Sequence, residues 1–172
     1  MKFDIKYDEK LSEISETTLS NANNTFNKIK TNYEKLKEDA AKIAHYCFEE
    51  ELTKPTTIYN LIFCVELHLK YYLLIMSNIN MMQIEQLGHN INDLINLSKN
   101  SINSDLFDFD TLYHLLNNFK TQKNKKLDIS KYENFRYNKQ KKSNNLIFRN
   151  YKITQKEKEN IREVLEWLNL HI

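Results

Sequence analysis

The chain has almost no glycine or proline, with only Gly88 and Pro55 among 172 residues. Sheets joined by tight turns usually need more of both residues, so these counts favour helices. A single glycine also excludes a glycine-rich loop of the kind that cradles phosphates. We therefore predict an all-α fold and expect no site of the glycine-rich nucleotide-binding classes.

Cysteine is scarce, and histidine is scattered. Cys47 and Cys64 both lie in apolar patterns of helical spacing, which predicts free thiols in a reducing cytoplasm rather than a disulfide framework. No pair of cysteines or histidines has the spacing of a zinc finger. We expect no metal and no cofactor, and we expect the protein to be cytoplasmic.

No secretory or membrane segment is expected. The first residues, from Met1 to Asp8, are too polar for a signal peptide. The run Ile58–Met76 is long and apolar, but Glu66 and Lys70 lie inside it, and each central charge costs about 2.5–3.5 kcal/mol on insertion scales. A buried helix is the better interpretation, and no membrane association is expected.

The hydrophobic fraction of 41% over 172 residues suits one domain with a single core, in which residues 1–20 form a possible N-terminal arm. Spacing and capping residues predict an antiparallel bundle of about five helices. A basic loop or short extended hairpin should precede the last helix. In the first half of the chain we expect a short helix at 11–19, a long helix at 24–51 and a helix at Ile58–Met76 after Pro55. In the second half we expect one helix beginning at Asn90, one beginning at Ser104 with Asp105 and Asp108 in its first turn, and a last one capped by Thr154 and Glu157.

The helix expected at 24–51 has apolar residues every three or four positions, which predicts one buried stripe. These residues are Phe26, Ile29, Tyr33, Leu36, Ala40, Ile43, Ala44 and Cys47.

Charge is distributed unevenly. Residues 120–158 contain 13 Lys and Arg but 3 Asp and Glu, whereas the rest of the chain contains 12 basic and 20 acidic residues. Aromatic residues alternate with these cations, a combination typical of surfaces that bind phosphates and stack bases. A solvated loop is the alternative. The candidate nucleic-acid-binding residues are Lys123, Lys125, Lys126, Lys131, Tyr132, Tyr137, Lys139, Lys141, Lys142, Arg149 and Tyr151.

Glu66 and Lys70 are one helical turn apart within the apolar run, so their side chains share a face. The first interpretation is a structural ion pair that orders the bundle. The alternative is a site in which one of them faces a cleft beside Arg136. We predict a buried polar cluster of Glu66, Lys70 and Arg136.

Three short motifs occur in order: Glu66-Leu-His-Leu-Lys70, Gly88-His89-Asn-Ile-Asn-Asp-Leu94 and Phe135-Arg136-Tyr137. In these residues the chain resembles the HEPN superfamily, the all-helical domains of prokaryotic toxin–antitoxin and abortive-infection systems. The resemblance covers the layout of about residues 24–170. It implies an association with RNA or a nucleotide in a bacterial defence or toxin-type system. It also implies a homodimer or a partner protein from the same operon.

One departure from this family affects catalysis. Active HEPN ribonucleases carry an arginine followed, after four to six residues, by a histidine, and this chain has no such pair. The resemblance therefore does not decide whether the protein is an enzyme. A non-catalytic interaction module is one alternative. A metal-independent ribonuclease with a rearranged site is another, and its candidate catalytic residues are His89 and Arg136.

Overall fold

The computed structural model describes residues 16–50, 54–77, 79, 81–101, 107–120, 126–133 and 153–170. Within these ranges the fold is all-α, as predicted, and no strand is present beyond one isolated antiparallel bridge between Lys120 and Lys126. The helices are α1 (Glu16–Glu49), α2 (Lys54–Met76), α3 (Met81–Gln86), α4 (Ile91–Lys99), α5 (Phe109–Asn117), the short 3-10 helix η3 (Ile129–Lys131) and α7 (Gln155–Leu170).

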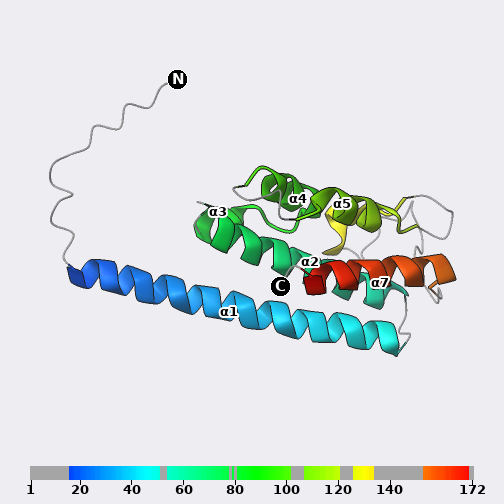
Figure 1. The fold of residues 1–172 in the computed structure, drawn as a ribbon, viewed down its shortest axis with the longest axis horizontal. Helices are drawn as coiled ribbons and strands as arrows, with labels where there is room; N and C mark the ends of the chain where they lie inside the picture. Colours follow the sequence, from blue (N-terminus) through cyan, green and yellow to red (C-terminus); the bar gives the residue numbers. More distant parts are fainter. Residues whose placement is uncertain are drawn as a thin grey trace, which may run out of the picture.

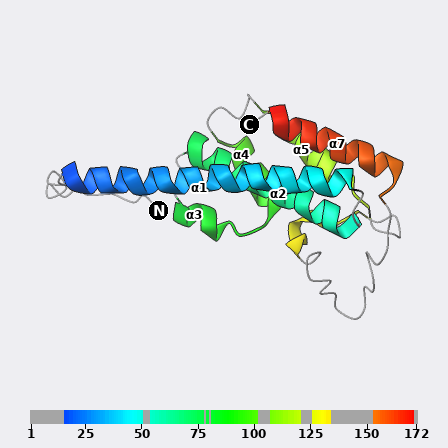
Figure 2. The same cartoon turned by 90° about the horizontal axis from the view of Figure 1, so that it is seen from below.

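The helices form layers around α2 (Figure 1). Helix α1 runs antiparallel to α2 along one side of it, and α4 and α5 lie on the opposite side. Helix α7 packs against both α5 and α1. The turned view shows α1 continuing beyond the other helices at its N-terminal end (Figure 2). Helix α2 is therefore the centre of the bundle.

Helix α2 is long and apolar enough to cross a membrane, but 72% of its most apolar window is buried inside the protein. Pro55 lies in its first turn, where a missing N–H costs nothing. Its side chains are buried on nearly all sides, including Ile58, Leu61, Val65 and Leu73. The prediction of a buried bundle helix is confirmed, and a core helix of this kind is consistent with a soluble protein.

Helix α1 differs from the prediction in two ways. The helices expected at 11–19 and 24–51 are one continuous helix from Glu16, because residues 16–49 contain no proline or glycine to interrupt it. The expected stripe is also not wholly buried. Ala40, Ala44 and Cys47 face the core, whereas Leu36 and Ile43 are about half exposed.

Local capping signals place two helix starts as predicted. The Asn90 side chain accepts a hydrogen bond from the N–H of Asn92 at the start of α4. Thr154 and Glu157 form a reciprocal capping box at α7, with the Thr154 N–H donating to Glu157 over 3.0 Å. The start expected at Ser104 was wrong. Asp108 is itself the N-cap of α5, and its side chain accepts from the N–H of Thr111.

Some sequence predictions lie outside the described residues. They concern residues 1–15 of the possible arm and residues 134–152 of the basic loop or hairpin. At the described edge of that segment, Leu127, Ile129 and Tyr132 are buried in the core around η3. The start of the basic segment is therefore anchored to the bundle.

Candidate functional site

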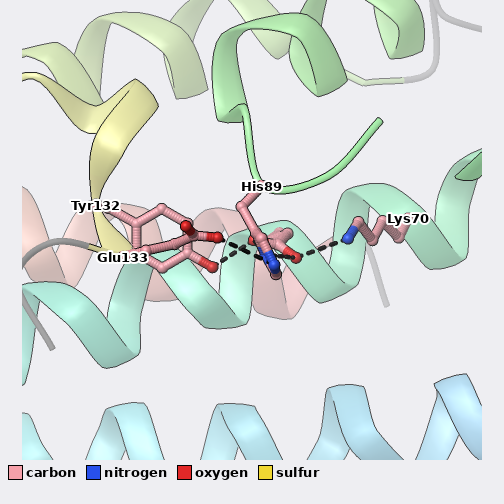
Figure 3. Close-up of polar contacts among 5 residues, drawn as sticks. Lys70, His89, Tyr132 and Glu133 are labelled. Carbon is pink, nitrogen blue, oxygen red and sulfur yellow. Dashed lines mark hydrogen bonds and ion pairs between the residues drawn. The ribbon is translucent and has the colours of Figure 1, made fainter. Parts of the chain in front are cut away.

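A polar cluster surrounds the Glu66 carboxylate of α2, and Figure 3 shows its members Lys70, His89, Tyr132 and Glu133. Glu66 is 1% exposed, and Lys70 Nζ donates to Glu66 Oε1 over 2.8 Å. This confirms the predicted ion pair. Two further side chains also contact the carboxylate, which are His89 and Tyr132. A buried carboxylate is tolerated only where its oxygens are satisfied in this way.

His89 reaches Glu66 from the turn between α3 and α4. Its Nδ1 lies 3.0 Å from Glu66 Oε1 and 3.0 Å from Oε2. Gly88 immediately before it has a φ of +60°, a left-handed conformation that glycine adopts without strain. The one glycine of the chain thus lets the backbone turn just before His89, and the N-cap Asn90 directly follows. Local chain geometry therefore positions the imidazole.

Tyr132 and Glu133 complete the cluster from the segment after η3. The buried Tyr132 hydroxyl donates a short hydrogen bond to Glu66 Oε2. Burial, and then the Glu66 charge, raise the pKa of Tyr132 well above its usual range, so the phenol remains protonated and donates. Glu133 Oε1 lies 3.0 Å from His89 Nε2. His89 therefore bridges one buried and one exposed carboxylate.

The side chains of this cluster differ in how far they are exposed to solvent. The Glu66 side chain is 2% exposed, whereas those of His89 and Glu133 are 52% and 50% exposed. A carboxylate only accepts, so a proton on His89 Nδ1 points at Glu66, which orients the ring. Nε2 then faces solvent and Glu133. Both ring nitrogens thus face a carboxylate, and because the ring is half exposed, a proton on Nε2 can be exchanged with Glu133 or with solvent.

The other predicted site residues fall into three groups. Lys126 is exposed, as a phosphate-binding cation should be. Tyr132 is buried and bonded to Glu66, so its prediction as a base-stacking residue was wrong, because the core already covers both of its faces. The following lie outside the described backbone or side chains: Lys123, Lys125, Lys131, Arg136, Tyr137, Lys139, Lys141, Lys142, Arg149 and Tyr151. The predicted contact of Arg136 with Glu66 stays a prediction.

A second buried polar group lies between α1 and α2. His68 Nδ1 lies 2.8 Å from the Cys64 carbonyl, and its Nε2 has no hydrogen-bond partner among the described residues. Burial lowers the pKa of His68 to about 4 and raises that of the Cys64 thiol to about 12. Lys37 on α1 lies 4.5 Å above the Tyr71 ring. The His68 imidazole and the Cys64 thiol are therefore uncharged near neutral pH, and Lys37 is buried. These side chains suit packing between α1 and α2 better than a reactive site.

The sequence pattern missed Glu133 and the role of Tyr132. A local signal was Asp128, which caps η3 by accepting from the N–H of Ser130, but this cap marks a turn and not the contact of that turn with Glu66. In the described part of the chain, no three acidic, histidine or cysteine side chains are arranged to hold a metal ion. Both cysteines, Cys47 and Cys64, are free thiols.

Comparison with known proteins does not place the chain in a family. No protein-family model, no curated protein and no solved structure matches it.

Proposed function

We propose that this chain is a HEPN-like, RNA- or nucleotide-associated protein of a bacterial defence or toxin-type system, without the standard ribonuclease motif. It binds its ligand through residues 120–158. The observation that carries this proposal is the segment's excess of 13 basic over 3 acidic residues, interleaved with aromatic side chains. Such a segment attracts phosphates and offers rings for base stacking.

The described contacts support this assignment in one respect. The described residues at the two ends of the segment are held in place, because Lys120 and Lys126 form a backbone bridge and Thr154 and Glu157 cap the start of α7. Between these points, Tyr132 and Glu133 hold the chain against Glu66 and His89. A ligand on the basic segment would thus lie on a chain that is tied to the bundle at both ends.

The test is binding of a fluorescein-labelled single-stranded RNA of about 20 nucleotides, measured by anisotropy over a range of salt concentrations. Each phosphate contact contributes a slope of about −0.7 to the plot of log affinity against log salt for single strands. We expect a slope steeper than −2. Binding that is undetectable at low salt, or insensitive to salt, would overturn the proposal.

A matched pair of variants locates the surface. Lys141→Gln with Lys142→Gln should weaken RNA binding and flatten the salt slope. Lys35→Gln with Lys42→Gln removes the same charge from exposed positions on α1 and should leave the slope unchanged. Equal losses of RNA affinity in the two variants would mean that RNA responds to the net charge of the protein and not to the basic segment.

A metal-independent ribonuclease with a rearranged site is a second candidate, favoured by the contact of His89 Nδ1 with buried Glu66. Cleavage of labelled RNA in the presence of EDTA tests it. The native chain should cut, and His89→Ala and Arg136→Ala should each lose most of the activity. Equal activity in all three proteins, or none, would eliminate this candidate.

A further inference from the structure

His89 contacts a carboxylate with each of its two ring nitrogens (Figure 3). Nδ1 lies 3.0 Å from both oxygens of Glu66, and Nε2 lies 3.0 Å from Glu133 Oε1. An ionised carboxylate only accepts hydrogen bonds, and a neutral imidazole carries one N–H, whereas an imidazolium carries two. Both contacts can therefore be hydrogen bonds at the same time only when the His89 ring is protonated at both nitrogens.

The two carboxylates depend on the imidazole to different degrees. Glu66 is buried and also accepts from Lys70 and Tyr132, so its charge is fixed in place. Glu133 is half exposed, so water can replace the imidazole as its donor. In a neutral ring the one N–H therefore stabilises the protein more at Nδ1, because water reaches Glu133 more readily than the buried Glu66. Nε2 then turns a lone pair toward Glu133, and two electron-rich atoms in contact repel each other.

The other ionisable groups around this cluster keep their charge near neutral pH. Burial raises the pKa of Tyr33, and nearby carboxylates raise it further, so this phenol stays neutral like that of Tyr132. The groups that lie around the cluster in the described elements are Tyr33 in α1, Glu66 and Lys70 in α2, Glu85 in α3, Asp93 in α4, and Tyr132 and Glu133 after η3. Among side chains of these types, only histidine ordinarily changes its charge between pH 5 and 8. His89 is therefore the group whose proton decides the state of the cluster.

We propose that His89 is a proton-controlled clasp between the bundle and the chain that leads into residues 134–152. The imidazolium joins Glu133 to Glu66, whereas the neutral ring keeps Glu66 and releases Glu133. The clasp is therefore closed at low pH and opens as the pH rises. Tyr132 stays anchored in both states, because its hydroxyl donates to Glu66 directly. The control thus acts at Glu133, and it does not depend on whether the basic segment binds RNA.

Nuclear magnetic resonance of the full chain, with nitrogen-15 in its histidines, tests the protonation states between pH 5 and 9. His89→Gln identifies the His89 signals by their loss. We expect protons on both nitrogens at the low end and on Nδ1 alone at the high end. Glu133→Gln should lower the midpoint of the His89 titration by at least about 0.3 pH unit, because it removes the anionic acceptor. Glu50→Gln removes the same charge at an exposed position after α1 and should shift the midpoint by less than about 0.1 pH unit. A neutral ring protonated at Nε2, or equal shifts in the two variants, would overturn the proposal.

A double-mutant cycle between His89 and Glu133 tests the opening of the clasp. Urea denaturation gives the unfolding constants of the native chain, His89→Gln, Glu133→Gln and the double variant at pH 5.5 and pH 8.5. At pH 5.5 these constants should show a coupling of about threefold between the two residues, as expected for a half-exposed ion pair. At pH 8.5 the coupling should be less than about 1.5-fold, because the neutral ring no longer donates to Glu133. Equal coupling at the two pH values, or none at either, would exclude the clasp.

Discussion

At the scale of single residues, Glu66 connects three parts of the chain through one carboxylate. Lys70 belongs to the same helix, His89 follows the one glycine, and Tyr132 is 66 positions away in sequence. Each donor satisfies an oxygen that would otherwise be buried without a partner. The polar cluster therefore contributes to the fold as well as to the candidate site.

Tyr132→Phe isolates one of these contacts, because it removes only the hydroxyl that donates to Glu66. Hydrogen bonds to charged groups contribute about 1.5–3 kcal/mol, so we expect the free energy of unfolding to fall by that amount. Urea denaturation followed by circular dichroism measures it. Tyr113→Phe, at an exposed tyrosine, should change stability by less than about 0.5 kcal/mol. If Tyr132→Phe also lowered the free energy of unfolding by less than about 0.5 kcal/mol, the hydrogen bond from Tyr132 to Glu66 would contribute little to stability.

His68 predicts how stability depends on pH. Burial lowers its folded-state pKa from 6.5 to about 4, so the unfolded chain binds a proton more readily than the folded one between these values. Its contribution is complete above pH 6.5 and is lost as the pH falls toward 4. The maximum loss is about 3 kcal/mol at 1.36 kcal/mol per pKa unit.

The measurement for His68 is urea denaturation at several pH values between 4 and 7.5. His68→Leu removes the titrating group and should give a shallower fall in stability over this range. His114→Gln, at an exposed histidine of α5, should keep the native profile. Parallel profiles for the native protein and His68→Leu would contradict the assignment.

At the scale of helices, three local signals located helix starts, whereas the one at Ser104 did not, because Asp108 is the N-cap of α5. Pro55, Asn90 and Thr154 act through hydrogen bonds or dihedral angles within four residues, so sequence alone locates the starts they define. The exposure of Leu36 and Ile43 depends on where α2 packs, and periodicity cannot report that. The polar stretch at residues 19–24 predicts a helix end, but it contains no residue that breaks a helix, and α1 runs through it without interruption.

A buried ion pair joins the starts of α2 and α7. Lys54 Nζ contacts Glu157 Oε1, and both side chains are less than 10% exposed. Burial alone would raise the pKa of Glu157, but hydrogen bonds from Lys54 and Thr154 outweigh it and lower the pKa overall. The stabilisation is therefore present above the usual carboxyl pKa of 4.5 and is lost as the pH falls through the lower folded value.

Glu157→Gln tests the pair while keeping a residue that completes a capping box. It leaves Lys54 buried without a counter-charge, so we expect a loss of about 3–5 kcal/mol in urea denaturation at pH 7. The double variant Lys54→Met/Glu157→Gln should recover a large part of that loss. Equal stability of Glu157→Gln and the native protein would mean that water screens the pair.

At the scale of the whole molecule, the candidate site could be predicted only in part. Glu66, Lys70 and His89 stood out because charges in an apolar run and a lone Gly-His pair are unusual. Glu133 and the buried position of Tyr132 could not be seen, because they depend on η3 docking against a helix more than 60 residues earlier. A contact between residues so far apart in the chain produces no periodic pattern of residue types in the sequence.

The burial of α2 makes a prediction for the complete molecule. Because its apolar window is mostly enclosed by the other helices, it is not available to lipid. In co-sedimentation with phosphatidylcholine vesicles, we expect the folded protein to remain in the supernatant. Mild acid or urea sufficient to open the bundle should move it to the pellet. Pelleting of the native protein with these uncharged vesicles would show that α2 inserts.

Anchoring of the basic segment on both sides has a consequence for affinity. Residues 134–152 begin directly after Glu133, which contacts His89, and end at the partly buried Ile153 before α7. A chain closed at both ends has already lost part of the conformational entropy that a free tail would lose on binding. The same residues supplied as a linear peptide, with identical charge, should therefore bind a polyanion more weakly than they do within the protein.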